Sequence, residues 1–321
     1  MEPFYDNFLE ALTERYPKKA ELVNALMEIL PLEKESIYRR LRKDIFFTSE
    51  EVMRISSIWN ISLDNIICMN PNKTRPFRFN MIEYVDPQES DYYLLEDYNQ
   101  TLALVGQDPE SRMVEITHTI PRSLYSRYEN LTRLFTMKWR YKHSMPETPM
   151  LFSDIQIPER MRTIEKEYIK RIHSISEINA IHDPRFIEHL VDDIVYFQSV
   201  KMITEKDVAL LKSELLELID YLEDTSIRGY LQDTGAKVFF YLSHTWLEGE
   251  YFLYESKYLT LSMVKILERN AVISFDQKVF LKFMEMFQST KRSSVLLSAS
   301  NSLQLIEFCA KQKEMVIALL G

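Results

Sequence analysis

The sequence predicts a mainly α-helical protein of two domains, and three observations support this. Apolar residues recur at helical spacing through residues 1 to 72. Residues 70 to 78, NPNKTRPFR, carry two prolines among polar side chains and predict a linker. Aromatic residues alternate in short stretches after Gly235. We therefore expect five short helices in residues 1 to 72 and, in residues 79 to 321, a larger α-rich α+β domain with a small antiparallel sheet.

The composition excludes several classes of protein. No apolar run approaches the length of a membrane span, and no basic stretch followed by an apolar run opens the chain, so we expect a cytoplasmic protein with no membrane partner. Cys68 and Cys309 lie too far apart for a disulfide framework or a zinc motif. With only 5 glycines in 321 residues, a glycine-rich phosphate loop is excluded, and we expect no cofactor.

The first two helices follow from apolar spacing and proline. Residues 3 to 16 carry an apolar residue at nearly every fourth position, and Pro17 ends this helix. A second helix spans residues 18 to 30 and is interrupted by Pro31. Leu32 is expected to enter the core at the turn that follows.

Residues 33 to 43 predict a short basic helix. They contain five Lys or Arg residues and two Glu residues, although the whole chain has a net charge of −9. Ile37 and Leu41 share one side of this helix and can pack against the domain. An apolar back and a basic front suit a helix that enters the major groove of DNA. The alternative is an ordinary solvated surface helix.

Two further helices complete the predicted domain. Thr48 and Glu51 have the spacing of a capping box, which opens a fourth helix. Ser62 caps a short fifth helix that contains Leu63, Ile66 and Ile67.

Residues 1 to 72 resemble the Cro-type, lambda-repressor-like helix-turn-helix family of bacterial transcriptional regulators. The resemblance is carried by Leu26-Met27-x-x-Leu30-Pro31-Leu32, by Ser36-Ile37-Tyr38-Arg39, and by the closing Asn60-Ile61-Ser62-Leu63-Asp64-Asn65-Ile66-Ile67. The sequence is also similar to a subgroup of bacterial regulators whose recognition helix ends in Tyr-Arg-Arg-Leu-Arg. The resemblance implies that residues 33 to 43 form the recognition helix.

The resemblance also implies which side chains contact DNA. Early residues of a recognition helix touch base edges, and basic residues hold phosphates or guanine. Arg40 is not included in the predicted set, because it lies about 100° around the helix from its neighbour. The predicted DNA-binding residues are Lys34, Glu35, Ser36 and Tyr38 at base edges, with Arg39, Arg42 and Lys43 at phosphate or guanine.

Residues 79 to 321 predict a helical layer over 79 to 230 and a small α+β part over 231 to 321. The helices are expected at 92–105, 124–141, 159–172, 186–202, 204–222, 276–288 and 303–320, and the strands at 112–120, 237–243, 251–255 and 258–265. Thr204 and Asp207 form a second capping-box pattern.

We do not expect an enzyme. His173, His182 and His189 have no metal-binding spacing, so polar surface is the favoured interpretation and no metal site is predicted. No nucleophile motif surrounds either cysteine. A stripe of aromatic residues is expected to form core or a dimer face rather than a ligand pocket: Phe239, Tyr241, Tyr251, Tyr254 and Tyr258.

Together these patterns predict a sequence-specific DNA-binding transcriptional regulator. Its partner is double-stranded DNA, and residues 79 to 321 are expected to form a homodimer and to sense a signal, with a small-molecule or peptide effector left open. The alternative is a non-catalytic protein–protein adaptor whose helix-turn-helix no longer binds DNA. Departures from the family at Met27, Pro31 and Leu41 permit that alternative.

Overall fold

The computed structural model describes residues 2–59, 61, 63, 66, 77–143, 150–298 and 302–320. The chain divides into two compact units, Met1–Pro76 and Phe77–Gly321, which we call the N-terminal unit and the C-terminal unit. The division falls within the segment predicted as a linker. In the described residues, no helix is both long and apolar enough to span a bilayer.

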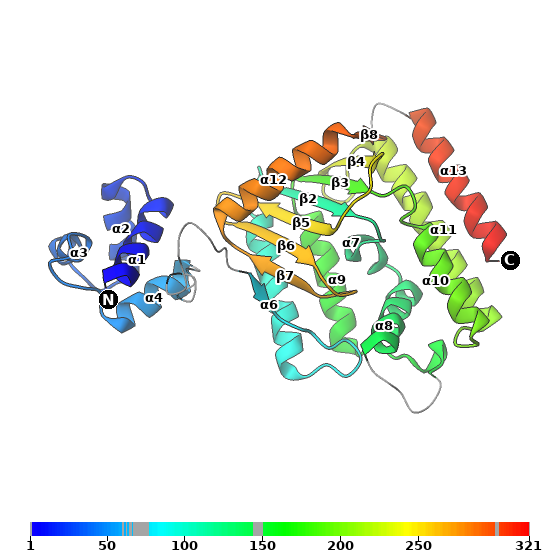
Figure 1. The fold of residues 1–321 in the computed structure, drawn as a ribbon, viewed down its shortest axis with the longest axis horizontal. Coiled ribbons are helices and arrows are strands. Elements are labelled where there is room, and N and C mark those ends of the chain that lie inside the picture. The colour runs from blue at the N-terminus through cyan, green and yellow to red at the C-terminus, as the bar shows by residue number, and fades with distance from the viewer. Residues whose placement is uncertain are drawn as a thin grey trace. The chain divides into compact units, whose positions relative to one another are not determined.

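The N-terminal unit is a small helical domain around one core (Figure 1). Its apolar residues come from the faces that the helical spacing predicts, and Phe8, Leu26 and Ile37 are fully buried there. Ser62, the predicted cap of the fifth helix, lies outside the described residues, whereas Ile66 is helical and buried in the same core. The unit contains the helices α1 (Glu2–Arg15), α2 (Lys19–Ile29), α3 (Lys34–Leu41) and α4 (Ser49–Trp59).

The helix ends in this unit have clear causes. The capping box at the start of α4 is present: Thr48 N–H donates to Glu51 Oε2 over 2.9 Å, and Glu51 N–H donates to Thr48 Oγ1 over 3.2 Å. At the end of α3, Lys43 has a φ of 66°, and Asp44 N–H donates to the carbonyl of Arg39 over 2.9 Å. This is a Schellman ending with lysine where glycine is usual.

The C-terminal unit is built on one eight-stranded mixed sheet in the order β1-β7-β6-β5-β2-β3-β4-β8. The three central strands β2, β3 and β4 are parallel, and all other neighbours are antiparallel. The predicted small antiparallel sheet is therefore wrong. The strands are β1 (Arg78–Phe79), β2 (Arg112–Thr117), β3 (Glu177–His182), β4 (Lys237–Ser243), β5 (Glu250–Glu255), β6 (Thr260–Lys265), β7 (Ala271–Ser274) and β8 (Ser294–Leu296).

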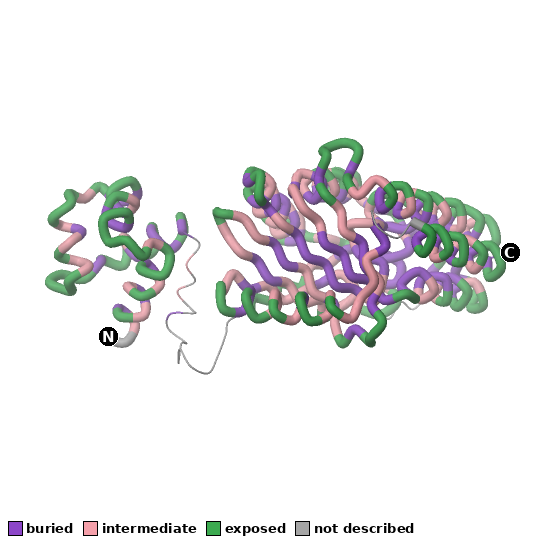
Figure 2. Tube along the Cα trace, turned by 90° about the horizontal axis from the view of Figure 1, so that it is seen from above, coloured by how far each residue is buried: buried purple, intermediate pink, exposed green. Residues whose placement is uncertain are grey.

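Helices cover both faces of this sheet, and buried residues follow the strands between them (Figures 1 and 2). Val114, Tyr241 and Leu253 face α12, whereas Met113, Ala180 and Phe240 face the helices on the other side. Because β2 and β3 belong to the sheet, the predicted division into a helical part and an α+β part at residue 230 is also wrong. The helices are α6 (Glu89–Gly106), α7 (Arg122–Tyr125), α8 (Glu129–His143), α9 (Glu159–His173), α10 (Glu188–Ser199), α11 (Glu205–Arg228), α12 (Gln277–Arg292) and α13 (Ser302–Leu319), with a 3-10 turn at Phe152–Asp154.

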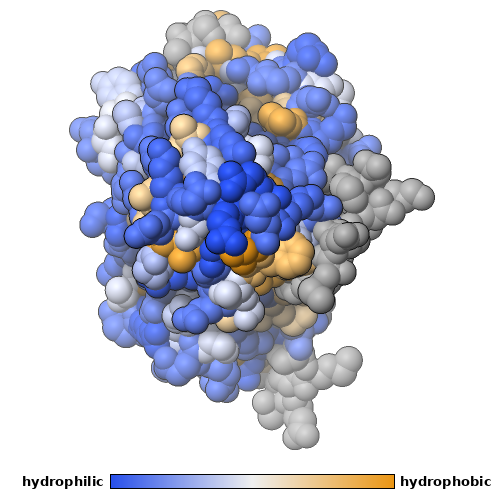
Figure 3. All heavy atoms as spheres, turned by 90° about the vertical axis from the view of Figure 1, so that its left-hand side faces the viewer, coloured by the Kyte–Doolittle hydropathy of each residue, from blue (hydrophilic) through white to orange (hydrophobic). Residues whose placement is uncertain are grey.

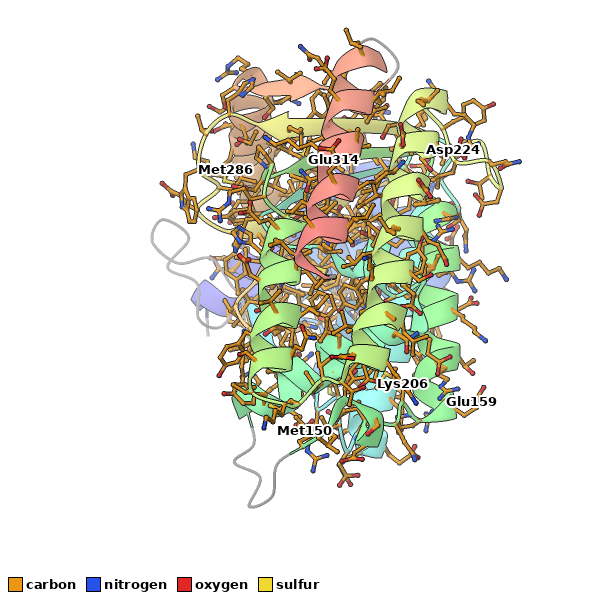
Figure 4. The ribbon with its side chains drawn as sticks, turned by 90° about the vertical axis from the view of Figure 1, so that its right-hand side faces the viewer. Met150, Glu159, Lys206, Asp224, Met286 and Glu314 are labelled. Carbon is orange, nitrogen blue, oxygen red and sulfur yellow. The ribbon has the colours of Figure 1, made fainter. Side chains whose placement is uncertain are left out.

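The last helix, α13, lies between α10 and α11 on the outer side of this layer (Figure 4). Leu305, Cys309 and Val316 on its inner side are buried in the main core, whereas Glu314 points outward. The capping box of Thr204 and Asp207 at the start of α11 is present as predicted. The C-terminal unit is therefore a layered α+β structure with helices in the majority.

Candidate functional site

The exposed side of α3 presents two free cations. Lys34 and Arg39 are exposed, and within the part of the chain that the structure describes neither side chain makes a hydrogen bond or ion pair. Ile37 holds the opposite side of the helix in the core. The face that Figure 3 turns toward the viewer is largely hydrophilic, with a few hydrophobic side chains scattered over it. The helix is thus fixed by its apolar back while two charges remain available to an external anion.

Arg40 stabilises the fold and is not available on the exposed side of α3. Its Nε and Nη2 donate to the two carboxylate oxygens of Glu51 over 2.9 and 2.8 Å, and its Nη1 donates to the carbonyl of Ser36 over 3.2 Å. Both side chains of the pair are largely buried. Burial raises the pKa of Glu51, but the hydrogen bonds from Arg40 and Thr48 outweigh it, so that this pKa is lowered overall. Arg40 therefore ties α3 to α4.

Replacing Arg40 with alanine is expected to destabilise the N-terminal unit by about 2 kcal/mol, because hydrogen bonds to charged groups contribute about 1.5–3 kcal/mol. Hydrogen exchange of peptides from α3 and α4 would measure the loss. Arg39→Ala is the matched control, because the Arg39 side chain has no partner among the described residues. Equal protection in the two variants would contradict the role given to Arg40.

Three other predicted DNA-binding residues are held by neighbouring charges. Arg42 follows α3 and donates to Glu35 over 3.0 Å and to Asp44 over 3.1 Å. Lys43 lies beyond the helix, and its Nζ is ion-paired with Asp6 of α1. The prediction that the helix extends to Lys43 is therefore wrong. All these pairs are exposed, and exposed pairs are weak enough to exchange for a phosphate.

Ser36 and Tyr38 are half-buried and less available than predicted. The carbonyl of Ser36 accepts from Arg40, and the ring of Tyr38 packs on the core beneath the ammonium group of Lys19, 5.7 Å away. Of the seven predicted residues, Lys34 and Arg39 have the freest side chains, Glu35, Arg42 and Lys43 are in exposed ion pairs, and Ser36 and Tyr38 are partly enclosed.

The predicted surface histidines are largely inside the C-terminal unit. His182 is 1% exposed and His173 is 8% exposed. No group of residues suited to a metal ion occurs among the residues described. His182 shares a hydrogen bond of 2.7 Å with Thr117, and its Nε2 lies 3.5 Å from Glu115. Interpreting these histidines as scattered polar surface was wrong for two of the three.

Glu115 and His182 line a cavity of about 60 Å³ between the sheet, α7 and α11. Burial raises the pKa of Glu115 to about 7, although Ser123 Oγ donates to the carboxyl over 2.8 Å, and burial lowers the pKa of His182 to about 3. Both groups are therefore mostly neutral between these values. The hydroxyl of Thr225 at the same cavity has no partner among the described residues.

The cavity does not assemble a catalytic set. A neutral imidazole beside a neutral carboxyl can exchange hydrogen bonds with a ligand, but no activated nucleophile adjoins them in the described residues. Cys309 is buried, which raises its thiol pKa to about 12 and leaves it protonated at neutral pH. We therefore assign no reaction to this cavity.

The aromatic stripe forms core on both faces of the sheet. Tyr254 is buried among residues near α6 and α9, whereas Tyr241 and the partly buried Phe239 and Tyr251 pack with α12. Tyr258 is 38% exposed and stands apart. Most of the stripe is core, the favoured interpretation, although Tyr254 also lines a cavity.

The sequence did not reveal the buried charged residues of the C-terminal unit. Glu115 carried one signal, a carboxylate inside the otherwise mostly apolar strand RMVEIT. No sequence signal indicated that Arg122, Glu165 and Arg269 are buried together, because they come from three distant segments that only the fold brings together. Comparisons of the chain with protein-family models, with curated proteins and with solved structures found no match.

Proposed function

We propose that the protein is a sequence-specific DNA-binding transcriptional regulator that uses α3 as its recognition helix. The observation that carries the proposal is the pair of exposed cations Lys34 and Arg39 on a helix whose other face is fixed in the core; neither side chain has a partner in the part of the chain that the structure describes. Arg40 is instead bound to Glu51.

The proposed mechanism uses two kinds of contact, one to base edges and one to phosphates. Lys34 and Arg39 contact base edges or phosphate, and Arg42 and Lys43 exchange their exposed acidic partners for phosphate oxygens. A single small domain binds DNA weakly, so the protein acts as a homodimer on two half-sites about one helical turn apart. The C-terminal unit supplies the dimer contact in this proposal.

Arg39→Ala is expected to weaken binding to a selected duplex by about 1–3 kcal/mol if Arg39 contacts a base. If it contacts a phosphate instead, the slope of log affinity against log salt becomes shallower by about one. Fluorescence anisotropy with random duplexes, followed by selection of a preferred sequence, would measure both quantities between about 50 and 200 mM salt.

Arg185→Ala is the matched control, because it removes one exposed arginine from the C-terminal unit and leaves α3 unchanged. It should bind DNA as the wild type does. If the wild type shows no salt-dependent binding at about 50 mM salt, or if both variants behave alike, the proposed function fails and a protein-binding adaptor becomes the better account.

A further inference from the structure

A second cavity, of about 70 Å³, lies between the sheet and the helices α6, α7 and α9. Five of its lining residues are aromatic: Tyr98, Tyr125, Tyr168, Phe252 and Tyr254. Three cationic side chains also line it, namely Arg122 of α7, Lys265 of β6 and Arg269 of the β6–β7 loop. Cations in such a low-dielectric setting require negative partners.

Glu165 is the one carboxylate that the two arginines share. Arg122 Nε donates to Glu165 Oε2 over 2.8 Å, and Arg269 Nη2 donates to Glu165 Oε1 over 2.7 Å. The Arg269 and Glu165 side chains are 1% and 4% exposed. Burial raises the pKa of Glu165, but the two guanidinium groups outweigh it and this pKa is lowered overall, so the carboxylate is charged. Two positive charges therefore face one negative charge.

The neighbouring charges do not supply the missing anion. Lys265 is itself paired with Glu250 over 2.5 Å. Glu268, which also lines the cavity, is neutralised by Lys138 over 2.7 Å and by Lys142 over 2.5 Å. Within the described segments, the cluster Arg122–Glu165–Arg269 keeps an excess of one positive charge.

Two nitrogens of this cluster are buried and have no hydrogen-bond partner among the residues described: Arg122 Nη2 and Arg269 Nε. Leaving a buried donor of a charged group unsatisfied costs more than about 1–3 kcal/mol. The Arg122 guanidinium stacks 4.2 Å from the ring centre of Tyr168, so its position is fixed even though its hydrogen bonds are incomplete. A preorganised donor beside an aromatic cavity is suited to an oxyanion.

The size of the cavity limits the ligand. A cavity of about 150 Å³ accommodates benzene, so about 70 Å³ excludes a nucleotide or an aromatic acid. We propose that this cavity binds a monocarboxylate smaller than benzene, namely acetate or propionate, with its carboxylate at Arg122 and Arg269 and its alkyl group against the tyrosine and phenylalanine rings. The monoanion cancels the excess charge. This binding does not depend on the proposed function.

Thermal unfolding and saturation-transfer NMR of the full chain with propionate test this inference. The melting temperature of the wild type should rise with the logarithm of propionate concentration, and the propionate methyl protons should receive saturation. 1-Propanol has the same chain without the charge, and sodium chloride matches the ionic strength. Neither should reproduce the effect.

Arg122→Gln should weaken propionate binding at least tenfold, because it leaves Arg269 and Glu165 as a balanced pair. Arg127→Gln is the matched control: it removes a nearby arginine that does not line the cavity, and its response should equal the wild type's. The inference is overturned if wild-type protein shows no propionate saturation, if propanol acts equally, or if Arg122→Gln responds as the wild type does.

Measuring propionate binding and DNA binding separately distinguishes the two proposals. Propionate binding that depends on Arg122 in a protein that does not bind DNA supports the cavity and contradicts the regulator. DNA binding without propionate binding supports the regulator and overturns the cavity.

Discussion

Replacing Glu165 with glutamine is expected to lower the free energy of unfolding of the C-terminal unit by about 3–5 kcal/mol, the cost of stranding a buried charge. The carboxylate holds Arg122 and Arg269 together and also accepts from Ser126 Oγ over 2.8 Å. Without the negative charge, two buried guanidinium groups repel one another, and one of them faces an amide NH2 donor in place of an acceptor oxygen. Glutamine keeps the volume, so the effect reports charge and not packing.

Urea unfolding read out by hydrogen exchange in peptides from β2 and β3 would measure this change in the C-terminal unit alone. Glu167→Gln is the matched control, because Glu167 lies on the same helix and pairs with Arg171 at a partly exposed position. It should change stability by less than about 0.5 kcal/mol. Similar losses in the two variants would show that Glu165 does not hold a buried cationic pair.

We expect the difference in unfolding free energy between Glu115→Gln and the wild type to depend on pH. Above pH 7 this difference should favour the variant by about 3 kcal/mol more than it does below pH 4.5, because each unit of pKa shift corresponds to about 1.36 kcal/mol. Burial raises the pKa of Glu115 from 4.5 to about 7. The folded state therefore holds this proton more tightly than the unfolded state does. The free energy of unfolding of the wild type therefore falls as the pH rises between these values. Glutamine does not titrate, so the variant lacks this pH dependence.

His182 has the opposite dependence, and the measurement must separate the two groups. Burial lowers the pKa of His182 from 6.5 to about 3, so its contribution to stability rises with pH between those values. This contribution is present in both proteins and largely cancels when Glu115→Gln is subtracted from wild type. Urea unfolding at pH 4, 6 and 8 gives the difference. A difference that does not depend on pH would show that Glu115 is not buried as a neutral acid.

The sequence predicted helices well where an apolar face follows the helical period. The prediction of residues 159 to 172 lies within one residue of α9, because its inward residues Met161, Ile164 and Tyr168 recur every three or four positions. The predicted helix 124–141 is instead divided into α7 and α8. Tyr128 N–H donates to the carbonyl of Tyr125 over 3.0 Å in a turn there, and neither glycine nor proline marks that break.

The sheet was harder to predict, because its central strands depend on distant partners. In β3, the sequence EINAIH contains Glu177, Asn179 and His182, which is typical of a surface segment. Asn179 is nevertheless buried, and its side-chain amide donates to Glu177 over 2.8 Å, while His182 bonds to Thr117 on β2. Such satisfaction of buried polar groups cannot be derived from local spacing.

The environment of the candidate DNA-binding residues was also predicted only in part, because some of their contacts involve residues distant in the sequence. Helical geometry alone separated Arg40 from its neighbours and placed Ile37 in the core. The ion pair between Lys43 and Asp6 joins residues from different helices, so no local pattern could indicate it. The sequence therefore identifies which charges lie on α3, and the fold determines which of them are free.

The strand order of the sheet also determines when each unit can fold. β1 at the start of the C-terminal unit pairs with β7 near its end, and β2 pairs with β3 across the three helices α7, α8 and α9. Such distant pairings make folding slow, whereas the N-terminal unit joins consecutive helices. The roughly 200 residues between the end of the N-terminal unit and the end of β7 take about 10–40 s to translate at about 5–20 residues per second. A nascent chain thus carries a folded N-terminal unit long before its C-terminal sheet can close.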